Sequence, residues 1–317
     1  MDRPVLVAVV GPTATGKSAL GIVLAQRFNG EVVACDSTAV YRLFDIGTDK
    51  VPAAAQQGIP HHMVDVADPA EEYSAAHYAR DAAAVIRDIT ARGRLPILVG
   101  GTGLYYRSLT RGFFPGPSRD EALRARLERI ASLRGSERLH ALLARVDPES
   151  AARISPRDRK RLIRALEVYF LTGRPLTSHF ADTRSPLPEY LVVTFALRIP
   201  PEATAERVAR RVDAQFAQGL LDEIRRILDA GVPPTALPFT GLVYRQGLEH
   251  LRGVRDEAAT RELIVRENRQ YARRQLIWFR KEPDLHWIHA AGERAETVEE
   301  VARALTSLEI RPDAPVP

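Results

Sequence analysis

The chain has 317 residues, of which 45% are hydrophobic and 27% charged, and this composition indicates a globular protein with a large core. Its net charge is +5, and its single cysteine, Cys35, excludes an internal disulfide, so we expect a reducing, cytoplasmic location. The first apolar run, residues 5–10, is too short for a signal peptide core or a membrane span, so we expect no membrane contact.

Four short apolar runs predict strands, at residues 5–10, 31–35, 95–99 and 191–197. Between them lie stretches in which apolar residues recur at helical spacing, at 17–28 and roughly 74–92. Strands that alternate with helices predict an α/β fold, with a parallel sheet flanked by helices on both faces.

The stretch between the third and fourth predicted strands is helical and basic. Residues 111–180 hold fifteen Lys and Arg against eight Asp and Glu, an excess that favours a polyanion such as nucleic acid as partner. A solvated arginine-rich surface is the alternative explanation. We expect 115–188 to be a helical, basic insertion domain. The catalytic core with its C-terminal helices would then comprise 1–114 and 189–291, and 292–317 would form a helix and a tail.

The first predicted strand leads into the motif G-x-x-x-x-G-K-S, a P-loop, and a predicted helix follows it. Glycines let successive backbone N–H groups turn toward a phosphate, while Lys17 adds a positive charge and Ser18 a hydroxyl for Mg²⁺. The predicted phosphate-binding residues are Gly11, Pro12, Thr13, Ala14, Thr15, Gly16, Lys17 and Ser18. The loop alone does not distinguish a nucleotide from another diphosphate.

Asp36 follows the second predicted strand directly. In α/β sheets the chemistry lies at the carboxyl ends of the strands, so Asp36 is a candidate for a general base or a partner of Mg²⁺. A carboxylate that only caps a short turn is the structural alternative.

Six motifs occur in order along the chain: GPTATGKS, DSTAVYR with DIGTDK, HHMVD, GGTGLYYRSLTRG, RLIRALEVY with LTGRPLTS, and RRQLIWFR. Together they resemble the tRNA dimethylallyltransferases of bacterial type, the IPP transferase family, over about residues 5–281. The resemblance implies a P-loop kinase-like core and a loop that holds dimethylallyl diphosphate rather than ATP. It also implies transfer of the dimethylallyl group to the N6 amine of the adenosine immediately 3′ of the anticodon, tRNA position 37, with Mg²⁺ as cofactor.

The resemblance also implies roles for single residues. Asp36 would be the base at the amine, Thr102 would contact the leaving group and the RNA, and Arg211 is favoured over Arg207 and Arg210 as the arginine at the leaving group. The residues expected to contact tRNA, through its anticodon stem-loop, are Asp36, Ser37, Thr38, Ala39, Thr102, Arg124, Lys160, Arg161, Leu162, Ile163, Arg164, Tyr244, Arg245, Gln246, Arg273, Arg274 and Arg280.

Two helical stripes of basic residues support a polyanionic partner. One comprises Lys160, Arg161 and Arg164; the other comprises Arg266, Arg269, Arg273 and Arg280. Many relatives have Gln where this chain has Ala39, and the glycine usually found next to the Tyr-Arg-Gln at 244–246 is displaced. A small-molecule kinase, a prenyltransferase acting on free adenine nucleotide and a non-catalytic RNA-binding module are the alternatives. We expect a monomer, and the residues lining the isoprenoid pocket are not predicted.

Overall fold

The computed structural model describes residues 3–112, 114, 116–180 and 183–310, and these form two compact units. One unit comprises Met1–Thr110 with Pro186–Pro317, and the other comprises Arg111–Ser185. The second unit nearly coincides with the insertion expected at 115–188. In the described part of the chain, no helix combines the length and the apolar character that a membrane span requires.

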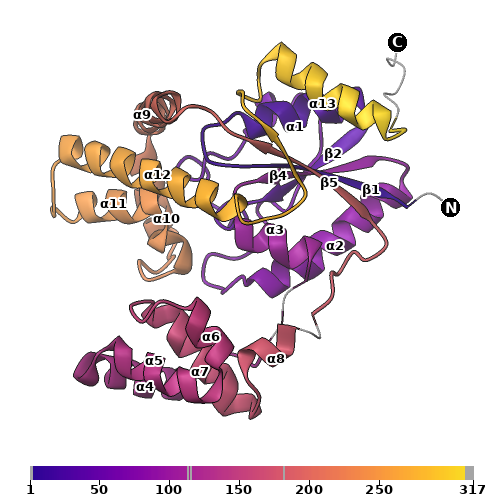
Figure 1. Cartoon of the computed structure of the whole chain (residues 1–317). Coiled ribbons are helices and arrows are strands. Elements are labelled where there is room, and N and C mark those ends of the chain that lie inside the picture. Colours follow the sequence, from indigo (N-terminus) through magenta and orange to yellow (C-terminus); the bar gives the residue numbers. More distant parts are fainter. Residues whose placement is uncertain (1–2, 113, 115, 181–182, 311–317) are drawn as a thin grey trace. The chain divides into compact units, whose positions relative to one another are not determined.

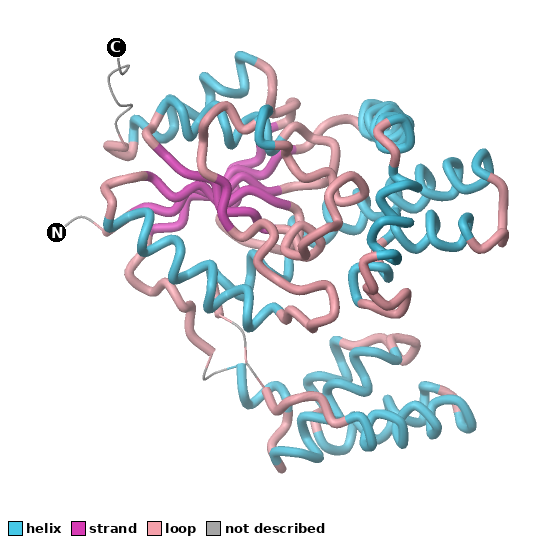
Figure 2. Tube along the Cα trace, turned by 180° about the vertical axis from the view of Figure 1, so that it is seen from behind, coloured by secondary structure: helices cyan, strands magenta, loops and turns pink. Residues whose placement is uncertain are grey.

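A six-stranded parallel sheet is the centre of the first unit, in the order β3-β2-β4-β1-β5-β6 (Figures 1 and 2). Its strands are β1 (Val5–Val10), β2 (Gly30–Cys35), β3 (His61–His62), β4 (Leu95–Gly100), β5 (Leu191–Leu197) and β6 (Leu285–Ile288). The predicted α/β fold with a parallel sheet is confirmed. The two edge strands, β3 and β6, were not predicted, because two and four residues are too few to show a periodic pattern.

Helices pack on both faces of this sheet. Helices α1 (Lys17–Arg27) and α13 (Ala295–Ser307) pack on one face, and α2 (Ala75–Ala91) and α3 (Gly103–Thr110) pack on the other. The unit also contains α9 (Pro201–Ala217), α10 (Leu220–Asp229), α11 (Leu242–Leu251) and α12 (Glu257–Phe279), which lie beside the sheet and pack on one another, and 3₁₀ turns at Ala53–Ala55 and Leu237–Thr240 (Figure 1). Successive residues of β1 serve different cores: Val10 packs in the core shared with α2 and α3, whereas Val9 packs in the core shared with α1 and α13. The C-terminal helix α13, expected as a separate segment, is therefore part of this unit's core.

The sheet register brings the carboxyl ends of three strands to one level. Gly100 of β4 pairs with Val10 of β1 on one side and with Cys35 of β2 on the other. The loops that begin at residues 11, 36 and 101 therefore leave the sheet side by side. Three sequence motifs that are far apart in the chain meet at this edge.

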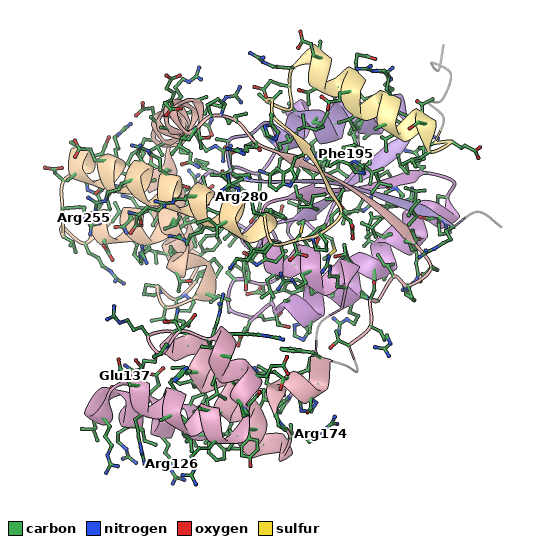
Figure 3. The ribbon with its side chains drawn as sticks, in the orientation of Figure 1. Arg126, Glu137, Arg174, Phe195, Arg255 and Arg280 are labelled. Carbon is green, nitrogen blue, oxygen red and sulfur yellow. The ribbon has the colours of Figure 1, made fainter. Side chains whose placement is uncertain are left out.

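The second unit consists of helices around its own apolar core. They are α4 (Glu121–Arg134), α5 (Ser136–Val146), α6 (Pro148–Arg153), α7 (Arg159–Thr172) and α8 (Leu176–Phe180). Leu139, Leu143 and Leu166 are fully buried in this core. Figure 3 shows Arg126 and Arg174 pointing away from the unit, and both are exposed, so part of the basic excess of this segment lies on its surface.

Candidate active site

The loop after β1 has the backbone geometry of a phosphate-binding loop. Gly11 and Gly16 have φ angles of +136° and +84°, which glycine adopts without strain. A Cβ on Gly16 would lie 2.8 Å from the backbone N of Gly292, and one on Gly11 would lie 2.6 Å from the carbonyl O of Leu197. Helix α1 begins at Lys17, so the loop ends at a helix N-terminus, where backbone N–H groups and the helix dipole attract anions.

Lys17 folds back onto the loop. Its Nζ donates a hydrogen bond of 2.6 Å to the carbonyl O of Pro12, which also accepts one of 2.8 Å from Thr15 Oγ1. Burial and the neighbouring Arg211 lower the pKa of Lys17 to about 7, against the opposing effect of Asp36. An anionic ligand beside Nζ would favour the charged form of this lysine.

Arg211, on α9, is the arginine that reaches the inside of the loop. Its Nη1 donates to Thr13 Oγ1 at 2.7 Å, and its Nη2 lies 3.0 Å from Asp49 Oδ2. Arg207 reaches the outside of the loop: it donates to the carbonyl O of Ala14 at 3.4 Å and pairs with Glu293. Of the three candidate arginines, Arg211 shares a cavity with Lys17, whereas Arg210 is exposed.

Asp36 lies at the end of β2 with one carboxylate oxygen engaged. Its Oδ1 accepts hydrogen bonds from Thr38 N at 2.8 Å, from Thr38 Oγ1 at 2.6 Å and from Ala39 N at 3.3 Å. Among the described residues, no hydrogen bond to Oδ2 is found. The Asp36 carboxylate therefore caps its turn, as the structural alternative predicts. Its second oxygen, Oδ2, is still available to accept a proton.

Thr102 lies next to Asp36 because β4 lies next to β2 in the sheet. Its N–H donates to the carbonyl O of Cys35 at 3.1 Å, and its Oγ1 accepts from Ser37 N at 3.0 Å. The threonine hydroxyl is thus held directly at the turn that Asp36 caps.

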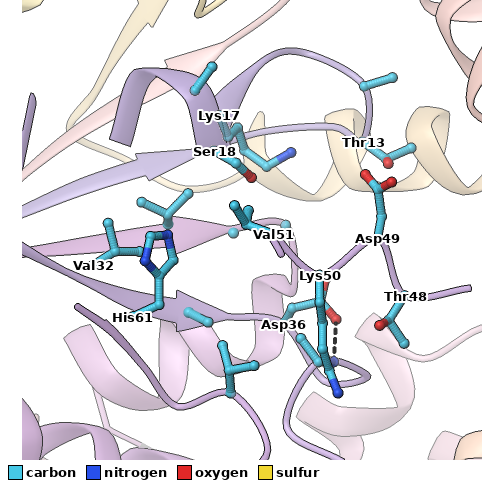
Figure 4. A pocket seen from close by; sticks show the side chains of 18 of the residues that line it. Thr13, Lys17, Ser18, Val32, Asp36, Thr48, Asp49, Lys50, Val51 and His61 are labelled. Atoms are coloured by element: carbon cyan, nitrogen blue, oxygen red, sulfur yellow. Dashed lines mark hydrogen bonds between the residues drawn. The ribbon is translucent and has the colours of Figure 1, made fainter. Parts of the chain in front are cut away.

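Two adjoining cavities share Asp36, Thr13 and Arg211 in their walls. The first, here called the loop cavity, has a volume of about 380 Å³ and contains Lys17 and Ser18; Figure 4 shows these side chains around it. Val32, Ala34, Val51, Val64 and Val99 give its lining an apolar part, beside which His61 also lines the cavity.

The second cavity, here called the aromatic cavity, has a volume of about 530 Å³. Five tyrosines line it: Tyr41, Tyr73, Tyr105, Tyr244 and Tyr271. Ser37 and Thr38 lie in its wall as well. Asp36 therefore stands between a phosphate-binding loop with an apolar wall and a chamber rich in aromatic rings, which suits a planar base.

Comparison with known proteins identifies the family of this chain. The family model described as IPP transferase matches residues 39–282. The tRNA dimethylallyltransferase of Solibacter usitatus (strain Ellin6076) is 46% identical over 294 residues, which cover 92% of this chain and 94% of that relative. The chain belongs to the IPP transferase family. The resemblance predicted from the sequence motifs is confirmed.

Other members of the family agree in sequence and in structure. The tRNA dimethylallyltransferase of Koribacter versatilis (strain Ellin345) is 42% identical over 96% of this chain and 99% of its own length. The crystal structure of tRNA isopentenylpyrophosphate transferase from Bacillus halodurans superimposes with a TM-score of 0.71 at 36% identity, covering 96% of each chain. A eukaryotic dimethylallyltransferase acting on tRNA gives a TM-score of 0.79 at 27% identity, covering 98% of this chain and 80% of that one.

Residues 160–164, which are expected to contact tRNA, differ in how far they are exposed to solvent. Lys160 and Arg161 are exposed. Leu162 and Ile163 are 0% and 2% exposed in the core of the second unit, so a contact of these two residues with tRNA, which stays a prediction, would have to be made by their backbone. The helical period places them on the inner face of α7, where they pack against the other helices.

Arg124 and Arg164 hold a buried carboxylate. Arg124 donates to both oxygens of Glu167 at 2.7 and 2.8 Å, and Arg164 donates to Glu167 Oε2 at 2.7 Å. The structure thus gives these two arginines a role in the core of the second unit, in addition to the role expected at the RNA.

The Tyr-Arg-Gln at 244–246 is also engaged within the protein. The Tyr244 hydroxyl donates to Glu223 at 2.5 Å and accepts from the Gly47 N–H at 2.9 Å. Arg245 and Gln246 both donate to Glu267, at 2.8 and 3.0 Å. Tyr244 lines the aromatic cavity from this fixed position, so it shapes that chamber.

The basic residues of α12 lie on two faces of the helix. Arg274 lines the aromatic cavity. A third cavity of about 790 Å³ is lined by the arginines at 198, 266, 269, 273 and 280. Within the described part of the chain, none of these five forms an ion pair, whereas most arginines elsewhere do. Figure 3 labels Arg280 at the end of α12.

Asp49 and Tyr271 are among the residues of the site that were not predicted. Asp49, which pairs with Arg211, lies inside the DIGTDK motif, but no role was inferred for it. Tyr271 lines both the loop cavity and the aromatic cavity. In the sequence, Tyr271 stands between arginines, and this pattern predicts only a basic helix. The position of Tyr271 at the edge of the sheet depends on how α12 packs in the folded protein.

Proposed function

We propose that this protein transfers the dimethylallyl group from dimethylallyl diphosphate to the N6 amine of adenosine 37 of tRNA and releases diphosphate. The observation that carries the proposal is Asp36 between the loop cavity and the aromatic cavity. The first offers groups for a diphosphate and an apolar wall for a five-carbon tail. The second offers tyrosine rings for a base taken from a single-stranded anticodon loop.

The exocyclic amine of adenine is a weak nucleophile, so its proton must be removed as the new bond forms. In the proposed reaction N6 forms a bond with the allylic carbon, the carbon–oxygen bond breaks, and its electron pair leaves on diphosphate. The N6 proton passes to Asp36 Oδ2, for which the described residues provide no hydrogen-bond donor, and Thr102 is held beside it.

The negative charge of the leaving diphosphate grows during this reaction. Lys17, Arg211 and the backbone N–H groups at the start of α1 would stabilise that charge, because they lie at the loop cavity. The apolar wall formed by Val32, Val64 and Val99 would exclude water from the allylic carbon and so disfavour hydrolysis.

The residues present fit a Mg²⁺ ion. Ser18 lines the loop cavity beside Lys17, and a single hydroxyl suffices, because Mg²⁺ in phosphate sites keeps several waters and binds phosphate oxygens. When bound, the ion would supply further neutralisation of the diphosphate.

The RNA would be held by basic side chains in both units. Lys160 and Arg161 are exposed on the second unit, and the five arginines that line the third cavity, beside α12, lack carboxylate partners in the described residues. Guanidinium groups suit phosphate oxygens. A tRNA substrate implies a cytoplasmic enzyme. We propose that the enzyme acts as a monomer.

A single-turnover assay with labelled dimethylallyl diphosphate, Mg²⁺ and either tRNA or AMP tests the proposal. We expect transfer to tRNA and little to AMP. Asp36→Asn keeps an acceptor for the Thr38 N–H but removes the base, so the rate should fall by roughly 10²–10⁴-fold, while the affinity for tRNA should change much less. The matched control is Asp65→Asn, an exposed carboxylate that pairs with Lys50. A rate for Asp36→Asn equal to that of the control would exclude Asp36 as the base.

Calorimetry separates the transferase from a kinase. Dimethylallyl diphosphate should bind with Mg²⁺, and Lys17→Ala should lose both this binding and turnover, because the lysine charge acts on the leaving group. ATP binding that is much tighter than dimethylallyl diphosphate binding, or rapid ATP hydrolysis, would overturn the proposal.

A further inference from the structure

The side chain of Gln275 forms hydrogen bonds with two loops of the site. Gln275 lies on α12 and is 7% exposed. Its Oε1 accepts a hydrogen bond of 2.8 Å from the backbone N–H of Thr13, and its Nε2 donates one of 2.9 Å to the carbonyl O of Gly101. The orientation of the amide is determined, because the Thr13 N–H can only donate and the Gly101 carbonyl can only accept.

The two loops carry the two halves of the proposed chemistry. Thr13 belongs to the phosphate-binding loop and accepts a hydrogen bond from Arg211 through its hydroxyl. Gly101 precedes Thr102, whose hydroxyl accepts from the Ser37 N–H in the turn that Asp36 caps. One buried amide therefore connects the loop for the diphosphate with the turn that holds the base.

The close packing around the Gln275 amide leaves no space for another arrangement of the amide and the two loops. A Cβ on Gly101 would lie 2.3 Å from Gln275 Nε2 and 3.1 Å from the carbonyl O of Gly11, so the glycine lets the amide and both loops approach closely. A side chain without an amide cannot accept from one loop and donate to the other at this position. A buried group that loses its hydrogen-bond partner is costly, so the loops would shift.

We propose that Gln275 is a positioning residue that sets the distance between the bound diphosphate and Asp36. The inference rests on the proposed function. Gln275 also lines the loop cavity, and the role proposed here is exerted through Thr13 on one side and through Gly101 on the other. Small errors in the alignment of reacting groups lower rates strongly, whereas ground-state binding of each substrate depends on other contacts.

The test uses the full-length protein with Gln275→Met and Gln275→Glu. Glu262→Gln is the control, on the same helix but exposed and outside the lining of the three cavities. We expect Gln275→Met to lower the single-turnover rate at saturating substrates by about 10- to 100-fold. The dissociation constant for tRNA should change less than about threefold, and the Glu262→Gln rate should equal that of wild type. Circular dichroism would verify that each variant is folded.

The pH dependence of the Gln275→Glu rate distinguishes a positioning role from a purely structural one. Its protonated carboxyl can accept from Thr13 and donate to Gly101, as the amide does, whereas its carboxylate cannot donate. Because the ordinary pKa of a Glu carboxyl is about 4.3, the rate of Gln275→Glu relative to wild type should rise as the pH falls from 8.5 to about 4.5, while that of Gln275→Met stays constant. A folded Gln275→Met variant with a rate within threefold of wild type, or a pH-independent ratio for Gln275→Glu, would overturn the inference. Absence of prenyl transfer by wild type would instead refute the proposed function.

Discussion

Replacing Glu167 with glutamine should destabilise the Arg111–Ser185 unit by about 3 kcal/mol. The carboxylate is fully buried in this unit. Burial alone would raise its pKa, but hydrogen bonds from Arg124, Arg164 and the Asp120 N–H outweigh burial and lower the pKa from 4.5 to about 2. A shift of about 2.5 pKa units corresponds to roughly 3 kcal/mol of favourable interaction with the ionised form.

The direction in which the pKa of Glu167 is shifted determines the pH range in which its carboxylate stabilises the unit. Because the pKa is lower in the folded state than in the unfolded state, the stabilisation is complete above about pH 5 and is lost as the pH falls toward 2. At pH 7 the wild-type protein therefore has the full contribution, and Glu167→Gln lacks it.

Hydrogen exchange at pH 7 measures the effect where it should occur. Both tryptophans, Trp278 and Trp287, lie in the other unit, so fluorescence would not report on this one. Amides in α4, α5 and α7 that exchange through opening of the unit should exchange about 100-fold faster in Glu167→Gln, the factor that corresponds to about 3 kcal/mol.

Glu149→Gln is the control for this prediction. Glu149 pairs with Arg153 at the surface, where their side chains are 59% and 62% exposed, and such pairs contribute little. If exchange in Glu167→Gln is no faster than in Glu149→Gln, the two arginines do not stabilise the buried carboxylate, and the reasoning fails.

Three further predictions concern other sites. Cys35 is fully buried, and burial raises the pKa of its thiol to about 12, so a thiol reagent at pH 8 should label the protein only after unfolding in urea. Gln substitutions at Lys160 and Arg161 together should lower the salt slope of tRNA binding by about one unit per lost phosphate contact; an unchanged slope would identify a merely solvated face. Tyr244→Phe should lower the unfolding free energy by about 1–3 kcal/mol, because the buried Glu223 loses a donor; urea denaturation monitored by circular dichroism would test this.

Much of the fold and of the site follows from local sequence patterns. The four longer strands, the phosphate-binding loop between β1 and α1, and the order of six family motifs depend on residues close together in the chain, where periodicity and spacing carry the information. Asp36 was identified for the same reason, because it directly follows an apolar strand.

Tertiary structure alone decided how these parts meet. The strand order places β4 between β1 and β2, which brings Thr102 and Asp36 together with the loop that contains Lys17. Gln275 and Asp49 gained roles through partners that lie far away in the sequence. Leu162 and Ile163 turned inward although they stand between basic residues. The physical reason is that burial and hydrogen bonding between distant segments depend on the packing of the whole chain, which the spacing of residues within one segment does not determine.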